Sequence, residues 1–137
     1  MSATSRTVEH VGEWRVELQA DTLEEIFVEL ARVIAQSSGK SSATPGPWED
    51  LEVEGRDREA LLVDFANELV SRSEIERRAY DELSDIEIYE ADKPCISARV
   101  RGREVRSWRS PLKAATYHGA FLTRDGEGWR AGVLFDV

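Results

Sequence analysis

The sequence predicts a single α+β domain over residues 1–137, in which two amphipathic helices pack on a largely antiparallel or mixed β-sheet. Two segments in the first half carry apolar residues three and four positions apart, the period of a helix with one buried face. Several shorter segments alternate apolar and polar residues, the period of a half-buried strand. These strand-like segments outnumber the helical ones and cluster late in the chain, which favours the α+β class.

Size and composition support one domain with an ordinary core. Of the 137 residues, 41% are hydrophobic, enough for a core that needs no disulfide or metal. The single cysteine, Cys95, excludes an intramolecular disulfide framework and a multi-cysteine zinc site. The segment from Met1 to Glu9 has no apolar run typical of a signal peptide, and no stretch approaches the roughly 18 apolar residues of a membrane span. We therefore expect a soluble, cytoplasmic protein.

The charge balance argues against a general nucleic-acid binder. The formal net charge is -9, from 27 acidic and 18 basic residues. Such acidity weakens non-specific attraction to polyphosphates, whose binders usually face them with Lys and Arg.

The first strand and the first helix are predicted in direct succession. Trp14, Val16 and Leu18 alternate with polar residues, as in a half-buried strand. A helix then opens at Asp21-Thr22, where Thr22 and Glu25 have the spacing of a capping box. Gly39 is its expected C-terminal cap. The apolar stripe of this helix comprises Leu23, Ile26, Phe27, Leu30 and Ile34.

The middle of the chain predicts a loop, a short strand and the second helix. Residues 40–47 are rich in Ser, Pro and Gly and predict a mobile loop. Leu51 and Val53 suggest a short strand that Gly55 ends. Asp57 is the expected N-cap of the second helix. Its buried stripe comprises Leu61, Leu62, Phe65, Ala66, Leu69 and Val70.

From Ser84 onward the pattern indicates strands. One contains Ile86 and Ile88, and another, after the turn at 92–94, contains Ile96, Ala98 and Val100. The last two strands flank a glycine-rich hairpin turn at residues 124–128. One face of the final strand carries Trp129, Ala131, Val133 and Phe135.

A basic segment lies between Arg99 and Lys113. It is either the charged solvent face of a strand and its following loop or a docking patch for a partner or RNA, and the sequence does not separate these readings. Trp108 lies in it between Arg106 and Arg109, where partner docking, RNA stacking and simple packing are the alternatives.

The last part of the chain carries the most specific motif. Residues 112–122 read Leu-Lys-Ala-Ala-Thr-Tyr-His-Gly-Ala-Phe-Leu, and after a turn the chain closes with Gly-Trp-Arg-Ala-Gly-Val-Leu-Phe-Asp-Val. This string resembles the C-terminal signature of the archease family, a Lys-Ala-Val-Thr-Tyr-His-Gly strand, a hairpin and a final Phe-Asp-Val or Phe-Asp-Ile. The helix starting at Ala20 and the Leu-Leu-Val-Asp-Phe-Ala-Asn-Glu-Leu stretch at 61–69 are also similar to the family's helices. The resemblance runs from about Glu9 to Val137.

The resemblance implies a non-catalytic role. Archeases are partners of the RtcB-type RNA ligase, which joins a 2′,3′-cyclic-phosphate or 3′-phosphate RNA end to a 5′-hydroxyl in tRNA splicing and RNA repair. They promote guanylylation and turnover of the ligase, and the ligase itself carries the nucleophile and the GTP site. This chain would thus meet RNA only indirectly, through the ligase.

The resemblance also implies a divalent-metal site, usually described with Ca²⁺; Mg²⁺ is the alternative. The family's N-terminal Asp-His-Thr-Ala-Asp aligns with Glu9-His10-Val11-Gly12-Glu13, in which both acids are one methylene longer. The expected ligands are Glu13 and Asp136, with Glu9 and the α-carboxylate of Val137 beside them. Spacing alone favours separate solvated acids.

Three further residues are candidate partner contacts. Lys113 and His118 flank Ala-Ala-Thr-Tyr, but they point apart in a regular strand, so a catalytic pair is not expected. The resemblance makes Lys113 a candidate ligase contact, and His118 and His10 either structural or site-lining residues. Together with Arg106, Trp108 and Arg109 they form the predicted partner-binding set. The alternative functions are a general chaperone or scaffold for RNA- or DNA-modifying enzymes and a small metal-dependent hydrolase using these carboxylates and His118.

Overall fold

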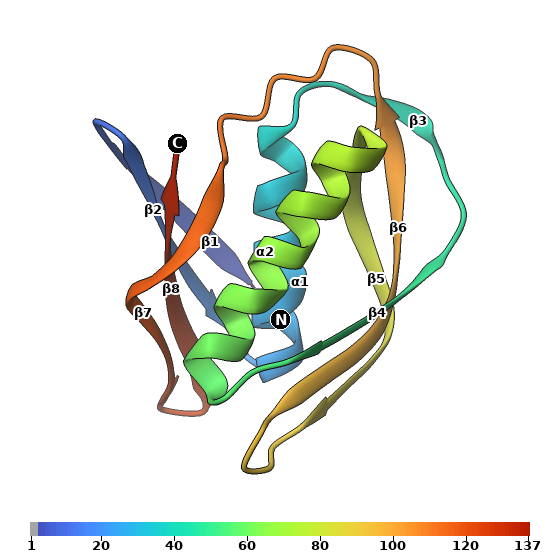
Figure 1. The fold of residues 1–137 in the computed structure, drawn as a ribbon. Coiled ribbons are helices and arrows are strands. Elements are labelled where there is room, and N and C mark those ends of the chain that lie inside the picture. Colours follow the sequence, from blue (N-terminus) through green and yellow to red (C-terminus); the bar gives the residue numbers. More distant parts are fainter. Residues whose placement is uncertain (1–2) are drawn as a thin grey trace.

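The protein places its two helices between two antiparallel β-sheets, as Figure 1 shows for the computed structural model, which describes residues 3–137. Met1 and Ser2 of the predicted domain lie outside the described residues. The first sheet has the order β1-β2-β8-β7, formed by β1 (Thr4–His10), β2 (Glu13–Ala20), β8 (Gly128–Asp136) and β7 (Ala114–Asp125). The predicted α+β class is confirmed, with two sheets where one was expected.

The second sheet is built around β6 (Cys95–Val105), which pairs on one side with β5 (Arg78–Tyr89). Its other side pairs with β4 (Glu49–Glu54) and β3 (Ser41–Pro45). All of these pairings are antiparallel.

Both helices begin as the sequence predicts. Helix α1 (Leu23–Ser37) starts after Thr22, whose hydroxyl oxygen accepts the backbone N–H of Glu25 at 3.2 Å and donates to the Glu25 carboxylate at 2.8 Å. Helix α2 (Arg58–Glu76) starts after Asp57, whose carboxylate accepts the N–H of Ala60 at 2.7 Å. Gly39 follows the end of α1 with φ +111°, a conformation that favours glycine.

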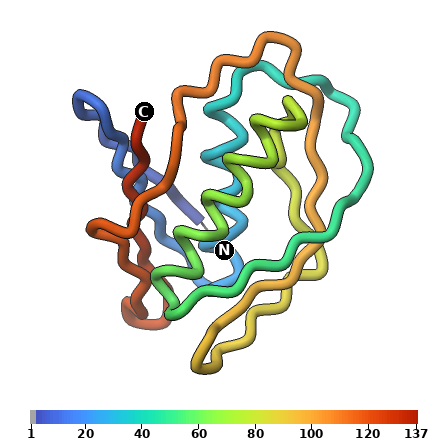
Figure 2. The backbone as a smooth tube through the Cα atoms, in the orientation of Figure 1, coloured from blue at the N-terminus to red at the C-terminus, as the bar shows by residue number. Residues whose placement is uncertain are grey.

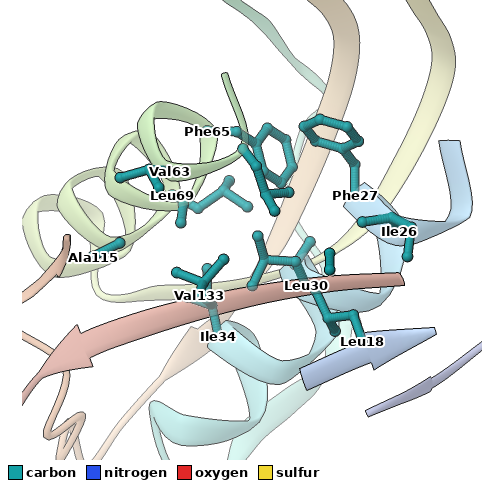
Figure 3. Packing of buried hydrophobic residues seen from close by; sticks show 14 of the residues in the cluster. Leu18, Ile26, Phe27, Leu30, Ile34, Val63, Phe65, Leu69, Ala115 and Val133 are labelled. Atoms are coloured by element: carbon teal, nitrogen blue, oxygen red, sulfur yellow. The ribbon is translucent and has the colours of Figure 1, made fainter. Parts of the chain in front are cut away.

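One apolar core joins the helices to both sheets. Figure 3 shows side chains of α1, α2 and the first sheet meeting in this core, with Phe65 and Phe27 from the two helices in contact. Their ring centroids are 5.0 Å apart and the planes make 83°, an edge-to-face arrangement. Every member of the two predicted helix stripes is buried: Leu23, Ile26, Phe27, Leu30, Ile34, Leu61, Leu62, Phe65, Ala66, Leu69 and Val70.

The prediction of a loop over residues 40–47 is wrong for Ser41–Pro45, which form the edge strand β3. Residues of β6, far away in the sequence, hold this strand. The Arg103 guanidinium donates to the Ala43 carbonyl, and the Gly46 N–H donates to the Gly102 carbonyl at 2.7 Å. An edge strand tolerates Pro and polar residues because one of its sides makes no hydrogen bonds to a neighbouring strand. Strand β1, also a mostly exposed edge, has too little alternation to be predicted.

Strand β5 begins at Arg78, six residues before the predicted start at Ser84. Arg77 ends α2 in the left-handed conformation with φ 55°, so the chain turns directly from helix into strand. The first part of β5 is charged because it pairs with the basic residues of β6: Glu82 accepts from Arg101 at 2.9 Å and from Arg103 at 3.0 Å. The first half of the basic segment is therefore neutralised within the domain.

Three chain segments meet at one end of the molecule. The C-terminus lies beside the β1–β2 turn, and the segment joining β6 to β7 crosses the same end in Figure 2. The N–H of Val137 donates to the Gly12 carbonyl at 3.2 Å, and the N–H of Lys113 donates to the Asp136 carbonyl at 2.9 Å.

No helix in residues 3–137 is long and apolar enough to cross a membrane.

We expect Phe65→Ala to lower the free energy of unfolding by about 3–5 kcal/mol, because it removes a fully buried ring and leaves a cavity. Denaturant unfolding followed by circular dichroism measures the effect. Ile75→Ala on the same helix is the matched control: its side chain is 74% exposed, so a change within about 0.5 kcal/mol is expected. Equal effects of the two substitutions would contradict the assignment of the core.

Candidate functional site

Glu13 and Asp136 lie directly opposite each other on neighbouring strands. They are Cα partners in the β2–β8 pairing, and the same row continues to His10 on β1 and Ala114 on β7. Directly opposed residues share one face of a sheet, with Cβ atoms about 4.5–5.5 Å apart. The next row contains the buried Phe135 and Ala115, which face the helices. The acidic pair therefore lies on the outer face, with Glu13 half-buried and Asp136 exposed.

Glu9 is not brought to this pair. Its Cα partner is Trp14, so it belongs to the neighbouring row, and successive residues of a strand point to opposite faces. Val137 reaches the neighbourhood of Glu13 through its backbone, because its N–H donates to the carbonyl of Gly12 in the β1–β2 turn. Within residues 3–137, no three or more His, Cys, Asp or Glu side chains are grouped so as to hold one ion.

A pocket of about 250 Å³ adjoins Glu13 on the outer face of the first sheet. It contains both histidines of the chain, which come from strands at opposite edges of that sheet. The lining residues are His10, Glu13, Arg15, His118, Gly119 and Leu134. The pocket thus joins basic side chains to one member of the acidic pair.

His118 reaches the pocket on an irregular part of β7. The β7–β8 register shifts between Thr116 and Phe121, and Gly119 within this bulge has φ +67°. Bulges bend a strand and redirect its side chains, which is their usual role beside functional sites. The prediction that Lys113 and His118 lie on opposite faces of a regular strand does not apply, because Lys113 precedes β7 and His118 lies in the bulge.

Helix α2 holds the bulged strand in place. The Asn67 side-chain amide donates to the Ala115 carbonyl at 3.0 Å, and its oxygen accepts the Ala115 N–H at 2.7 Å. Two residues further along β7, the Tyr117 hydroxyl donates to the Asp64 carboxylate. That hydrogen bond is the main reason that the pKa of Tyr117 is raised above its ordinary value. These contacts replace the strand partner that the edge strand β7 lacks on this side.

Arg15 contributes a cation to the pocket. Arg6 Nε donates to the neighbouring Glu17 carboxylate at 3.0 Å, and this hydrogen bond is the main cause of the lowered pKa of Glu17. Arg15 Nε is 3.7 Å from Glu17, beyond hydrogen-bonding distance. Arg15 and Glu17 therefore form an ion pair without a hydrogen bond.

The remaining predicted partner residues lie on the segment between β6 and β7. Trp108 is half-buried against a small cluster of Ala35, Ala79 and Val105, and the Arg77 guanidinium lies 5.1 Å from its ring centroid. Arg106 and Arg109 are exposed.

A hollow of about 650 Å³ lies along this segment. Its lining includes Trp108, Lys113 and the C-terminal Val137. The six predicted partner-binding residues thus form two groups: His10 and His118 at the pocket, and Lys113, Arg106, Trp108 and Arg109 around the crossing segment.

Three site residues were not predicted from the sequence. Arg15 lies two positions after Glu13 in a strand, so their common face could have been inferred from the period of two. Asn67 lies in the helix motif similar to that of archeases, but nothing local indicates that it binds β7. The bulge that places Gly119 had no signal except the glycine itself.

The fold and site define a small two-sheet α+β domain whose outer face pairs two carboxylates beside a histidine-lined pocket. The model of the archease protein family matches residues 6–137, and the chain belongs to this family. The predicted resemblance is confirmed.

Known relatives cover nearly the whole chain. It is 26% identical over 135 residues to the protein archease of Methanopyrus kandleri, covering 95% of this chain and 96% of that protein. It is 29% identical over 136 residues to that of Pyrococcus furiosus, with coverage of 94% and 95%. The solution structure of Methanobacterium thermoautotrophicum protein 1598 has the same fold, with a TM-score of 0.80, 20% identity, and coverage of 97% of this chain and 98% of that chain.

We expect Asn67→Ala to destabilise the protein by about 1–3 kcal/mol, because it leaves a backbone N–H and C=O of β7 without partners. Faster hydrogen exchange at the Ala115 amide, measured by NMR, should accompany the loss. Ser71→Ala, at an exposed position of the same helix, is the control and should leave that exchange rate unchanged. Unaltered exchange in Asn67→Ala would mean that α2 does not fix the strand.

Proposed function

We propose that this chain is a non-catalytic activator of an RtcB-type RNA ligase and that its outer acidic pair takes part in activation. Membership of the archease family supports the choice of partner. The observation that carries the role of the site is the opposition of Glu13 and Asp136 in the β2–β8 register. These two residues are far apart in sequence, and the fold alone makes them neighbours.

The ligand proposed for this pair is a hard divalent cation that keeps most of its hydration, because the register brings together only the two carboxylates of Glu13 and Asp136 among the described residues. Ca²⁺ and Mg²⁺ bind oxygen ligands, and two carboxylates offer up to four oxygen atoms. The remaining positions would be filled by water or by oxygen atoms of a ligand or partner. A bound cation would supply positive charge at the end of the domain and offset the repulsion between the two carboxylates. Ca²⁺ is the first choice and Mg²⁺ the second.

The same end of the molecule provides the surface for the ligase. Lys113 and Trp108 border a hollow beside Val137, and the exposed Arg106 and Arg109 lie on the same crossing segment. This end would activate the ligase by a population shift. It would bind the ligase conformation that is competent for guanylylation more tightly than the ligase's other conformations. Every chemical step then belongs to the ligase.

We expect saturable one-site binding of Ca²⁺ to the metal-free protein and none to Asp136→Ala, as measured by titration calorimetry. One carboxylate remains after this substitution, too few oxygen ligands to hold a hard cation. Asp125→Ala, at the opposite end of β7, is the matched control and should bind like the wild type. Undiminished binding by Asp136→Ala would remove the cation from the proposal.

We also expect Asp136→Ala to abolish activation of an RtcB-type ligase from the same organism while keeping the wild-type circular dichroism spectrum. Its side chain is exposed, so its removal does not open the core. The readout is the rate of ligase guanylylation with and without the added protein, again with Asp125→Ala as the control. Full activation by Asp136→Ala would contradict the proposed role of the acidic pair.

A further inference from the structure

We propose that Arg77 is a positioning residue, which fixes the side chain of Trp108 and thereby orients the crossing segment, residues 106–113 between β6 and β7, toward an acidic surface of the partner. The inference rests on the proposed function and deepens it, because this segment carries part of the surface proposed for the ligase. It gives a role to a residue at the end of α2, outside the acidic pair and the pocket beside it.

The backbone of the crossing segment is attached to the C-terminal ends of both helices, near which it passes in Figure 1. Directly after α1, the Ser38 carbonyl accepts the N–H of Arg109 at 3.2 Å. Directly after α2, the Arg77 carbonyl accepts the N–H of Val105 at 2.9 Å. These hydrogen bonds fix the path of the chain, but they leave the side chain of Trp108 to other contacts.

The Trp108 ring has two kinds of contact. It packs against the small apolar cluster of Ala35, Ala79 and Val105, and the Arg77 guanidinium lies 5.1 Å from its centroid. A guanidinium within about 6 Å of an indole is attracted by the electron-rich face of the ring. Trp108 also lines the hollow of about 650 Å³, so the ring has open space beside it. The cation of Arg77 therefore stabilises the ring against the cluster.

The backbone conformation of Arg77 is one that favours glycine. Its φ of 55° is left-handed, and a helix that ends in this conformation usually has glycine at that position. Within residues 3–137, Asp85 is the other non-glycine residue with a positive φ. Arginine thus occupies a position where glycine would relieve backbone strain, and the contact of its side chain with Trp108 accounts for that choice.

The orientation of the crossing segment decides where its cations point. Arg106, Arg109 and Lys113 are exposed, and none of them forms an ion pair with another residue in the described part of the chain. Cations of the same basic segment inside β6 are instead neutralised, as Arg101 is by Glu82. Cations without an internal partner fit an acidic surface on a binding protein. A pre-oriented segment meets such a surface with less loss of entropy.

Substitution of Arg77 by glycine separates positioning from a purely structural role. Arg77→Gly removes the guanidinium but relieves the left-handed backbone, so the variant should not unfold at a lower denaturant concentration than the wild type. Nuclear Overhauser contacts from the Trp108 ring to the methyl groups of Ala35 and Val105 should nevertheless weaken. Loss of an exposed cation–π contact lowers the ratio of fixed to released ring about two- to fivefold.

The affinity for an RtcB-type ligase from the same organism is the second readout, measured by titration calorimetry. Arg77→Gly should bind up to about fivefold more weakly, because a smaller fraction of the protein has the competent orientation. In a Trp108→Ala background the same substitution should have no further effect, since Arg77 acts through that ring. Asp85→Gly is the matched control: it relieves the same backbone conformation further along β5 and should leave both readouts unchanged.

The inference is wrong if the ring contacts of Arg77→Gly match those of the wild type, or if this variant binds the ligase as tightly. A loss of affinity that persists in the Trp108→Ala background would also overturn it, because Arg77 would then contact the ligase itself. Normal activation by the wild type beside these results leaves the proposed function standing. Failure of the wild type to bind the ligase would reject the proposed function, while weakened ring contacts in Arg77→Gly would still support the positioning of Trp108.

Discussion

Strands β2 and β8 pair over eight residues, from Glu13 opposite Asp136 to Ala20 opposite Trp129. This register places the second strand, β2, beside the last strand, β8, in the centre of the first sheet and sets which side chains face the helices. A shift by one residue would turn Phe135 outward and Asp136 inward, exposing a core ring and burying a carboxylate. The hydrophobic cost of that exchange fixes the register, and the register in turn places the acidic pair.

The helices stabilise the site indirectly. Helix α2 packs into the core through residues such as Phe65 and, from its partly exposed side, binds the edge strand β7 through Asn67 and Asp64. The bulge at Gly119 thus rests on a helix that the core holds rigidly. This arrangement suits a protein whose proposed task is to present a fixed surface to a larger enzyme, because a pre-organised surface loses little entropy on binding.

Local signals allowed much of the fold to be predicted, and the missed parts depend on distant contacts. The Thr22 and Asp57 caps and the two helix stripes involve residues within a few positions of one another. Strand β3 was missed because its pairing depends on β6, about sixty residues away. The sequence did not show that Glu9 lies in a different row from Glu13. Glu9 belongs to β1, an edge strand whose residues do not alternate between apolar and polar. For the site, motif resemblance indicated Glu13, Asp136 and His118, whereas their geometry required the register and the bulge.

A double-mutant cycle on Ca²⁺ affinity tests the central claim, that the β2–β8 register makes Glu13 and Asp136 one site. Titration calorimetry would compare the wild type, Glu13→Gln, Asp136→Asn and the double variant. If the two carboxylates hold the same ion, each single substitution should cost nearly as much affinity as both together, a strongly non-additive result. Additive losses, or a Glu13→Gln variant that binds like the wild type, would show that the two acids act separately and would contradict the account.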